Sequence, residues 1–196
     1  MEREYIVPVF IGCDFIGNAF FVGNYLITAY HVLNNKSNIK FRFKGEWYEF
    51  DDNCLLLKEY PQDFQEQASF GYQLDLAVYK MNDKLSPLEF EDVNTSELCR
   101  YLGYNYLDEG NIDFVETNDI KVSIVSYHYP LYGNPIRLNN VLSSYKSSAI
   151  EGNSGGPLFQ NGKVVGMLVA VNGHRQDLYI DSRYIRKRIV ECYNMN

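Results

Sequence analysis

A serine surrounded by glycines is the residue of this chain best placed to act as a nucleophile. It lies in the run Glu151-Gly152-Asn153-Ser154-Gly155-Gly156-Pro157-Leu158. Glycine adopts backbone conformations that other residues avoid and lets the chain approach another molecule closely. A hydroxyl on such a loop can attack a carbonyl carbon, while the amides of Gly152 and Ser154 stabilise the oxyanion that forms. A glycine-rich surface loop is the alternative, and the length of the string weighs against it.

This serine needs a base within hydrogen-bond reach, because its hydroxyl is a poor nucleophile at neutral pH. His31, in Thr28-Ala29-Tyr30-His31-Val32-Leu33, would take the proton of Ser154 and return it to the leaving amine. Asp75, at the start of Asp75-Leu76-Ala77-Val78-Tyr79, would fix the histidine tautomer and stabilise the imidazolium. Taken singly, the first fits a structural histidine and the second a turn residue. Together, the three motifs predict a catalytic triad.

In the order His, Asp, Ser, these motifs resemble those of the chymotrypsin-like (trypsin-fold) serine peptidases, closest in style to the bacterial HtrA/Deg and glutamyl-endopeptidase branch. Subtilisins and α/β-hydrolases carry the same groups in other orders. The resemblance extends from about Gly17 to the C-terminal helix. It implies an all-β fold of two six-stranded antiparallel Greek-key barrels, with the site in the cleft between them, and an endopeptidase that forms an acyl-enzyme. No PDZ module is expected.

The elements that must position these residues are short strands. Strand-like segments recur about every ten residues, a spacing typical of a closed or sandwiched all-β fold. In the first half they cover 4–11, 18–22, 25–29, 39–43, 46–50, 54–58 and 75–80. In the second half they cover 98–104, 113–116, 120–127, 140–144, 157–160, 164–171 and 178–180. The polar stretch 59–73 is expected to form a surface loop.

We expect one peptidase domain over 1–196. Its predicted parts are an N-terminal barrel over about 1–81, a linker over about 82–97, a C-terminal barrel over about 98–181 and a C-terminal helix over about 182–193. Asp181-Ser182 is the expected helix N-cap. The helix has an apolar face that would pack on the second barrel, made of Ile185, Ile189 and Cys192. Its cations indicate a solvated face rather than a nucleic-acid or membrane contact, and they are Arg183, Arg186, Lys187 and Arg188.

Composition argues against several other classes of function. A net charge of −7, without a basic stripe outside the C-terminal helix, argues against nucleic-acid binding. No apolar run approaches the roughly 18 residues of a membrane span, and Met1-Glu2-Arg3-Glu4 does not begin a secretory signal. The cysteines form no C-x-x-C pair and miss the disulfide positions of secreted relatives, so we expect free thiols and a cytoplasmic location. They are Cys13, Cys54, Cys99 and Cys192.

No cofactor and no metal is expected. The histidines other than His31 are widely separated and have no carboxylate at ligand spacing, which argues against zinc. His128 is expected at a strand end. His174 follows a strand that should border the substrate cleft, so it is either a rim contact or a solvent-exposed side chain.

The resemblance also assigns substrate-binding residues. One wall of the pocket would contain Ser148, Ala149, Ile150 and Glu151, and the other Val169, Ala170 and Val171. Ser148 stands where trypsin-type enzymes keep an aspartate, so a strong preference for basic residues is not expected. Met167-Leu168 stand near the place of the glutamyl-endopeptidase histidine. The expected primary side chain is apolar and of small to medium size, and Glu151 at the mouth would disfavour acidic residues.

Asn153 stands where secreted relatives carry the aspartate that pairs with a newly cut N-terminus, so zymogen activation is not expected. Protein or peptide substrates are expected, and control would come from ordering of the oxyanion loop, from substrate supply, or from a co-encoded activator or target protein. Two alternatives remain: a protease-fold binding or regulatory module without catalysis, and an esterase that uses the same triad. The intact triad argues against the first, and the rarity of esterases on this fold against the second.

Overall fold

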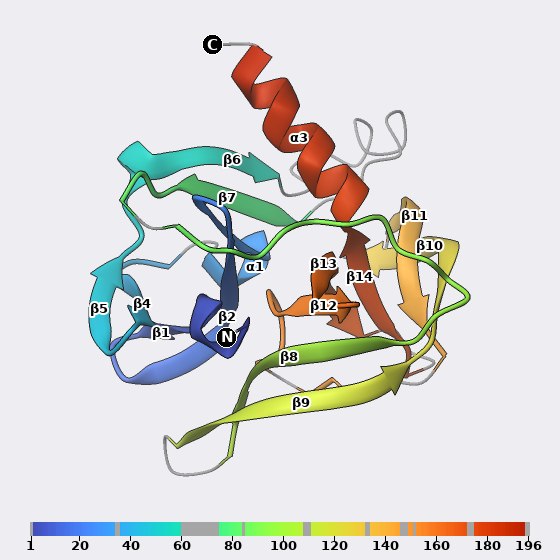
Figure 1. The fold of residues 1–196 in the computed structure, drawn as a ribbon, viewed down its shortest axis with the longest axis horizontal. Helices are drawn as coiled ribbons and strands as arrows, with labels where there is room; N and C mark the ends of the chain where they lie inside the picture. Colours follow the sequence, from blue (N-terminus) through green and yellow to red (C-terminus); the bar gives the residue numbers. More distant parts are fainter. Residues whose placement is uncertain are drawn as a thin grey trace.

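The computed structural model describes residues 2–33, 36–59, 75–83, 85–107, 111–131, 134–145, 149–150, 152–171 and 175–194, and gives the backbone alone for 126–131 and 134–140. Figure 1 shows two curled antiparallel sheets side by side, with one long helix along their upper edge. The predicted all-β architecture is confirmed. Each sheet has seven strands where the resemblance implied six, because every one of the strand-like segments pairs with a neighbour.

The first sheet is built from residues 6–80, in the order β5-β4-β1-β2-β3-β7-β6. Its strands are β1 (Ile6–Ile11), β2 (Asp14–Val22), β3 (Tyr25–Thr28), β4 (Ile39–Phe43), β5 (Glu46–Glu49), β6 (Leu55–Glu59) and β7 (Leu76–Lys80). Gly23, at φ 57°, makes the tight turn between β2 and β3 that its sequence predicts. The first strand begins two residues later than expected, because Glu2–Tyr5 forms a 3-10 helix.

The second sheet is built from residues 99–181, in the order β10-β11-β14-β13-β12-β8-β9. Its strands are β8 (Cys99–Tyr106), β9 (Ile112–Ile120), β10 (Val122–Leu131), β11 (Asn134–Ser144), β12 (Pro157–Gln160), β13 (Lys163–Val171) and β14 (Asp177–Asp181). β9, β10 and β11 are longer than predicted, since their polar residues alternate with apolar ones too loosely to mark the strand ends. Most of the predicted loop 59–73 lies outside the described residues.

The hydrophobic core joins the two halves. Its largest cluster contains residues of both sheets, among them Phe20 and Ile27 of the first and Phe159 and Met167 of the second, and all four are fully buried. Burying a large apolar side chain is worth about 1.5–3 kcal/mol. Aromatic side chains such as Phe20 and Phe159 therefore contribute directly to the hydrophobic contact between the two sheets. In the same seam, β8 contacts both β1 and β2.

The segment between the sheets lies against both of them. Ser86 forms a bridge with Gly23 at the β2–β3 turn, and Phe90 forms a parallel bridge with Val164 on β13. Leu88 is buried. The connection therefore helps to hold the two halves together.

The C-terminal helix α3 (Ser182–Asn194) matches its prediction closely. Asp181 caps it, since its Oδ1 accepts the amide of Arg183 at 2.8 Å. The apolar face is buried on β13 and β14 as expected. It also reaches the first sheet, where the hydroxyl of Tyr184 donates to Glu59 of β6 at 2.6 Å and Arg188 pairs with the same carboxylate. The helix therefore fastens one half to the other.

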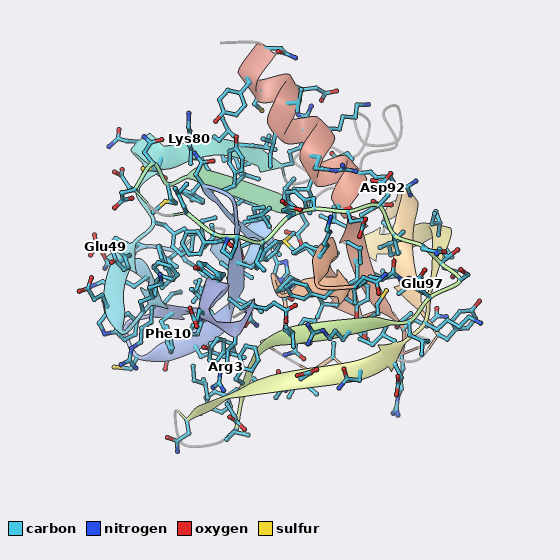
Figure 2. All side chains as sticks on the ribbon, in the orientation of Figure 1. Arg3, Phe10, Glu49, Lys80, Asp92 and Glu97 are labelled. Atoms are coloured by element: carbon cyan, nitrogen blue, oxygen red, sulfur yellow. The ribbon has the colours of Figure 1, made fainter. Side chains whose placement is uncertain are left out.

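Every cation of this helix has a carboxylate partner. Arg183 pairs with Asp181, Arg186 with Asp92, Lys187 with Glu191, and Arg188 with Glu59 and Glu191. Figure 2 shows Asp92 beside the first turns of α3. These cations are therefore partnered within the protein, as expected of a solvated structural face. No helix in the described chain is long and apolar enough to span a membrane.

Candidate active site

His31 and Asp75 meet because the strands that carry them are neighbours. His31 lies in the single helical turn α1 (Tyr30–Leu33) just after β3, and Asp75 lies just before β7. β3 and β7 pair antiparallel, with Thr28 opposite Ala77, so the end of one strand adjoins the start of the other. His31 Nδ1 lies 2.6 Å from Asp75 Oδ2, and the backbone amide of His31 donates to Asp75 Oδ1 at 2.8 Å. Both carboxylate oxygens thus orient the histidine.

Asp75 adopts an uncommon backbone conformation to do this. Its φ is 92°, a region that residues other than glycine rarely adopt. Such a conformation costs about 1–3 kcal/mol and is found mainly where the surrounding structure enforces it, often at active sites. Here the amide of Asp75 donates to the carbonyl of Glu59 at 2.9 Å, which fixes the backbone from the β6 side.

The electrostatics of His31 follow from this pairing. Burial by itself would lower the pKa of His31, but the hydrogen bond and the negative charge of Asp75 outweigh it, and the pKa is raised above its ordinary value. Lys36 opposes the shift slightly through its positive charge. Asp75 therefore stabilises the imidazolium, which is the form a general base reaches when it removes a proton.

The loop of Ser154 docks on the first sheet through its backbone. The amide of Asn18 donates to the carbonyl of Ser154 at 2.8 Å, and the amide of Gly155 donates to the carbonyl of Leu168 at 2.8 Å. A Cβ at Gly155 would lie 2.0 Å from the carbonyl oxygen of Asn18, so only glycine fits there. Gly152 has φ 91° and Gly155 φ 83°, both in the region that favours glycine.

Gly17 marks the place where the serine and histidine segments meet. A Cβ at Gly17 would lie 2.8 Å from a methyl group of Val32, the residue after His31, and 3.1 Å from the carbonyl oxygen of Ser154. Both segments therefore pack on one residue of β2. The structure joins His31 to Asp75 directly and brings Ser154 to the same junction of the two sheets.

Asn18 holds this junction with its side chain, which is fully buried. Its Nδ2 donates to the carbonyls of Gly152 at 2.9 Å and of Tyr104 at 3.1 Å, and its Oδ1 accepts the amide of Tyr104 at 2.6 Å. One amide thus ties β2 to the oxyanion loop and to β8. The sequence reading missed this residue. Its only signal is a polar side chain inside an otherwise apolar strand, next to Ala19-Phe20-Phe21-Val22.

Asn153 is held by a second set of hydrogen bonds and has 2% of its surface exposed. Its Oδ1 accepts the amide of Ile150 at 2.8 Å, and its Nδ2 donates to the Tyr104 carbonyl at 3.3 Å and to the Asn105 side chain. The hydroxyl of Tyr101 donates to its carbonyl at 2.8 Å. Burial raises the pKa of Tyr101 far above its ordinary value, so this hydroxyl remains a donor. The loop is therefore ordered by neutral groups.

The residues assigned to the substrate pocket are only partly described, since Ser148 and Glu151 lie outside the described residues. Of the remainder, Ile150 and Val171 are exposed, whereas Val169 is 7% exposed. Ala149 is half-buried and contacts the second core cluster, and Ala170 is half-buried at the end of β13.

Asp177 connects the two predicted pocket walls and was not identified from the sequence. Its backbone pairs with Val171, on one predicted wall, and its Oδ1 accepts the amide of Ala149, on the other, at 3.3 Å. The side chain is fully buried, and the hydroxyl of Tyr179 donates to its Oδ2 at 3.3 Å. A buried carboxylate thus lies between the two predicted walls, in addition to Glu151, which the sequence analysis placed at the mouth.

A cavity of about 570 Å³ adjoins the oxyanion glycine on another side. It is lined by Phe15, Ile16, Lys36, Tyr106, Ile150 and Gly152. Phe15 packs directly over Gly152, where a Cβ would lie 2.8 Å from its ring. Lys36 donates to the carbonyl of Val32 at 2.9 Å, and burial lowers its pKa. The cavity therefore has apolar walls and one cation.

The other histidines are not part of this site as described. His128 lies within β10, its backbone paired with Arg137, and its side chain is outside the described residues, as is all of His174. In the described part of the chain, no group of three or more His, Cys, Asp or Glu side chains could hold a metal ion.

Two antiparallel β-sheets with a hydrogen-bonded His–Asp pair at their junction define the class of chymotrypsin-like serine peptidases. A family model described as the trypsin-like peptidase domain matches residues 17–167, a range that contains all three predicted catalytic residues. The chain therefore belongs to the trypsin-like peptidase domain family, as its motifs predicted, and is a serine peptidase by family and fold. Comparison with curated protein sequences gives no match.

Several solved structures share the fold. The active form of the Rv3671c protease from M. tuberculosis is 18% identical with a TM-score of 0.69, over 97% of this chain and 82% of that one. The MamO protease domain from Magnetospirillum magneticum is 20% identical with a TM-score of 0.62, over 95% and 96%. The HtrA-type protease AlgW with a decapeptide is 18% identical with a TM-score of 0.65, over 92% and 52%. At these identities the likeness supports the fold alone.

Proposed function

We propose that this protein is an endopeptidase that cleaves peptide bonds through a triad of His31, Asp75 and Ser154. The observation that carries the proposal is the double hydrogen bond from His31 to Asp75, at 2.6 and 2.8 Å, in a trypsin-like domain whose glycine-rich serine loop docks beside it. Ser154 attacks the scissile carbonyl as His31 takes its proton. The C–N bond then breaks, the leaving amine receives that proton from His31, and the resulting acyl-enzyme is hydrolysed by water with His31 again as the base.

The oxyanion is stabilised by the backbone amides of Gly152 and Ser154. Neither amide forms a backbone hydrogen bond among the described residues, which leaves both available to a substrate oxygen. Removing one such donor typically costs about 2.7–4 kcal/mol of transition-state stabilisation.

The primary substrate side chain enters between the walls 149–150 and 169–171. Val169 and Ala170 favour a small to medium apolar group, as the sequence suggested. Asp177 holds the two walls in place, because its fully buried carboxylate accepts the amide of Ala149 and the hydroxyl of Tyr179. A peptide library should therefore show a preference for apolar side chains of small to medium size.

We further propose that the protein works in the cytoplasm and is controlled by substrate supply or by an activator or target protein, without N-terminal cleavage. None of its four cysteines forms a disulfide, which suits a reducing compartment. Asn153 is held by uncharged partners, so its loop does not require a new N-terminal amine. We also propose the domain parts predicted from the sequence, namely an N-terminal barrel over about 1–81, a linker over about 82–97, a C-terminal barrel over about 98–181 and a C-terminal helix over about 182–193.

Labelling with a fluorophosphonate probe tests the catalytic proposal. Wild type should react, while Ser154→Ala and His31→Ala should lose labelling and peptidase activity, a loss of roughly 10⁶-fold for the whole triad. A folded wild type that stays unlabelled would instead support a binding or regulatory module. Hydrolysis of esters without any cleavage of peptides would support an esterase.

A further inference from the structure

A second concave surface lies on the first half, on the side of the β8–β9 hairpin. It has a volume of about 910 Å³ and is referred to here as the β1–β5 groove. Its lining includes Arg3, Phe10, Cys13, Arg42, Lys44 and Trp47. Figure 2 shows the labelled Arg3 and Phe10 close together at the lower left, where this groove lies. None of the residues assigned to the triad belongs to it.

The groove is cationic in an acidic protein. Its lining carries Arg3, Arg42 and Lys44 against one carboxylate, that of Glu4, whereas the whole chain has a net charge of −7. Among the described residues, none of these three cations forms an ion pair. By contrast, every cation of α3 forms an ion pair with a carboxylate. Unpaired cations gathered around one concavity attract an anionic partner and select against cationic ones.

Aromatic rings provide the apolar part of the same surface. Trp47 is 52% exposed and meets Phe10 edge-on at 5.1 Å between ring centroids. The ammonium of Lys44 lies 5.4 Å from the centroid of Tyr5, and the guanidinium of Arg3 lies 4.5 Å from that of Phe114. Exposed tryptophan and arginine are the residue types that contribute most to binding at protein interfaces. A ligand for this groove therefore combines negative charge with apolar side chains.

The groove adjoins the cavity beside Gly152, with Phe10 and Phe15 in contact between them. Phe15 lines that cavity and packs on Gly152, and its ring contacts that of Phe10, in the groove, at 5.9 Å. Tyr106 lines the cavity and Tyr104 lines the groove, on the same strand and two residues apart. A chain that crosses Phe15 from the catalytic loop therefore passes directly into the groove.

We propose that the β1–β5 groove binds an acidic, partly apolar segment of the substrate polypeptide on the leaving-group side of the scissile bond. The direction rests on the proposed function, because the cavity shares only Ile150 with the walls of the primary pocket and contains none of the residues 169–171 on the opposite wall. Lys36 in the cavity adds another cation along the same path. A polypeptide is the occupant because the path starts at the site where a peptide bond is cleaved.

Peptide binding to the groove is measured first, in a variant that lacks the proposed nucleophile. The chain has a single tryptophan, Trp47, so its fluorescence reports directly on the groove. Ser154→Ala protein is titrated with a peptide rich in Asp, Glu and Leu, and with a matched peptide carrying Asn and Gln in place of the acids. The acidic peptide should change the fluorescence with saturation, should protect Cys13 from a thiol reagent, and should bind more weakly at high salt. The neutral peptide should bind at least tenfold more weakly.

A pair of charge-matched variants tests where the peptide binds. Arg3→Glu/Arg42→Glu/Lys44→Glu changes the groove, and Lys58→Glu/Lys121→Glu/Lys187→Glu changes three exposed lysines elsewhere by the same net charge. The groove variant should weaken acidic-peptide binding roughly 30- to 100-fold, because each of the three reversals removes an attraction and adds a repulsion. The control should stay within about threefold of the parent. Replacement of the same three groove residues by Gln gives a milder variant if reversal impairs folding.

The results of these experiments test the groove proposal and the triad proposal separately. Equal binding of the acidic and neutral peptides, equal effects of the two triple variants, or tighter binding of a single-stranded oligonucleotide than of the acidic peptide would refute the groove proposal. In active protein, acidic residues placed after the scissile bond should raise kcat/KM, and the groove variant should abolish that gain while fluorophosphonate labelling stays unchanged. Labelling without peptide binding rejects the groove alone, and peptide binding without labelling rejects the triad alone.

Discussion

The two sides of the candidate active site are built differently. The proposed base, His31, and its orienting acid, Asp75, lie in the first half beside neighbouring strands and contact each other directly, since Asp75 bonds both the ring and the backbone of His31. The loop of the nucleophile lies in the second half and is held by a residue of the first half, Asn18, together with Asn153 and Tyr101. One side is a pair of reactive groups. The other is a backbone positioned by buried amides that themselves take no part in proton transfer.

Because of this difference, substitutions on the two sides should impair different properties of the protein. Changing the acid leaves the fold almost intact but leaves the imidazole in the wrong tautomer, so the chemistry fails. Changing a buried amide leaves several backbone groups without partners, each at about 1–3 kcal/mol, so geometry and stability fail together. Substitutions on the two sides should therefore give distinguishable patterns of kcat, KM and melting temperature.

The largest expected effect is that of Asp75→Asn. Asparagine tolerates the positive φ of this position better than most residues, so the protein should fold. Its amide can donate to His31 Nδ1, which stabilises the wrong tautomer, and kcat should fall roughly 10⁴-fold with a small change in KM. Steady-state kinetics with a peptide substrate, alongside thermal melting, measures both. A loss of less than tenfold in kcat would show that Asp75 does not orient the base.

A smaller effect is expected for Asn18→Ala, which leaves the carbonyl of Gly152 unheld. The oxyanion loop should lose its fixed orientation, so kcat should fall about 10²-fold, near the cost of one oxyanion donor, with KM changing much less. The rate of fluorophosphonate labelling should fall in parallel.

Gln160→Ala is the matched control for that variant. Gln160 is also a buried amide and also binds backbone at both ends, with Asn94 as its partner at 2.8 and 2.9 Å, but it does not contact the nucleophile loop. Both variants should lose stability, at about 1–3 kcal/mol for each backbone group left without a partner, and only Asn18→Ala should lose kcat. Equal losses of kcat in the two would mean that Asn18 is merely structural.

The sequence predicted the reactive side of this site better than the positioning side. The histidine and aspartate stand in long motifs with regular strands beside them, and alternating apolar residues located almost every strand. Asn18 and Asp177 have no motif, because their roles depend on contacts with residues more than twenty positions away, such as Gly152 and Ala149. The groove was equally unreadable, since Arg3, Arg42 and Trp47 come together only when β1, β4 and β5 pair.

The smallest expected effect is a shift in the pH dependence of the base. Asp75 raises the pKa of His31 above its ordinary value of 6.5, so the acid limb of kcat/KM, which needs neutral His31, should have its midpoint above that value. Lys36→Met removes an opposing charge and should move the midpoint slightly higher. Asp75→Asn should move the histidine titration, followed by NMR, below that of wild type, because burial then acts unopposed.

The same raised pKa has a consequence for stability, with a defined sign. Because folded His31 binds its proton more tightly than unfolded His31, the pair contributes its full stabilisation below about pH 6.5 and loses it as the pH rises through the folded pKa. Thermal melting of wild type and Asp75→Asn across this range should therefore differ most at the acidic end and converge at the alkaline end. A difference in melting temperature that grew with pH would mean that Asp75 does not favour the protonated ring of His31. That result would contradict the account of the His31–Asp75 pair and would leave the account of the buried amides of Asn18 and Asn153 unaffected.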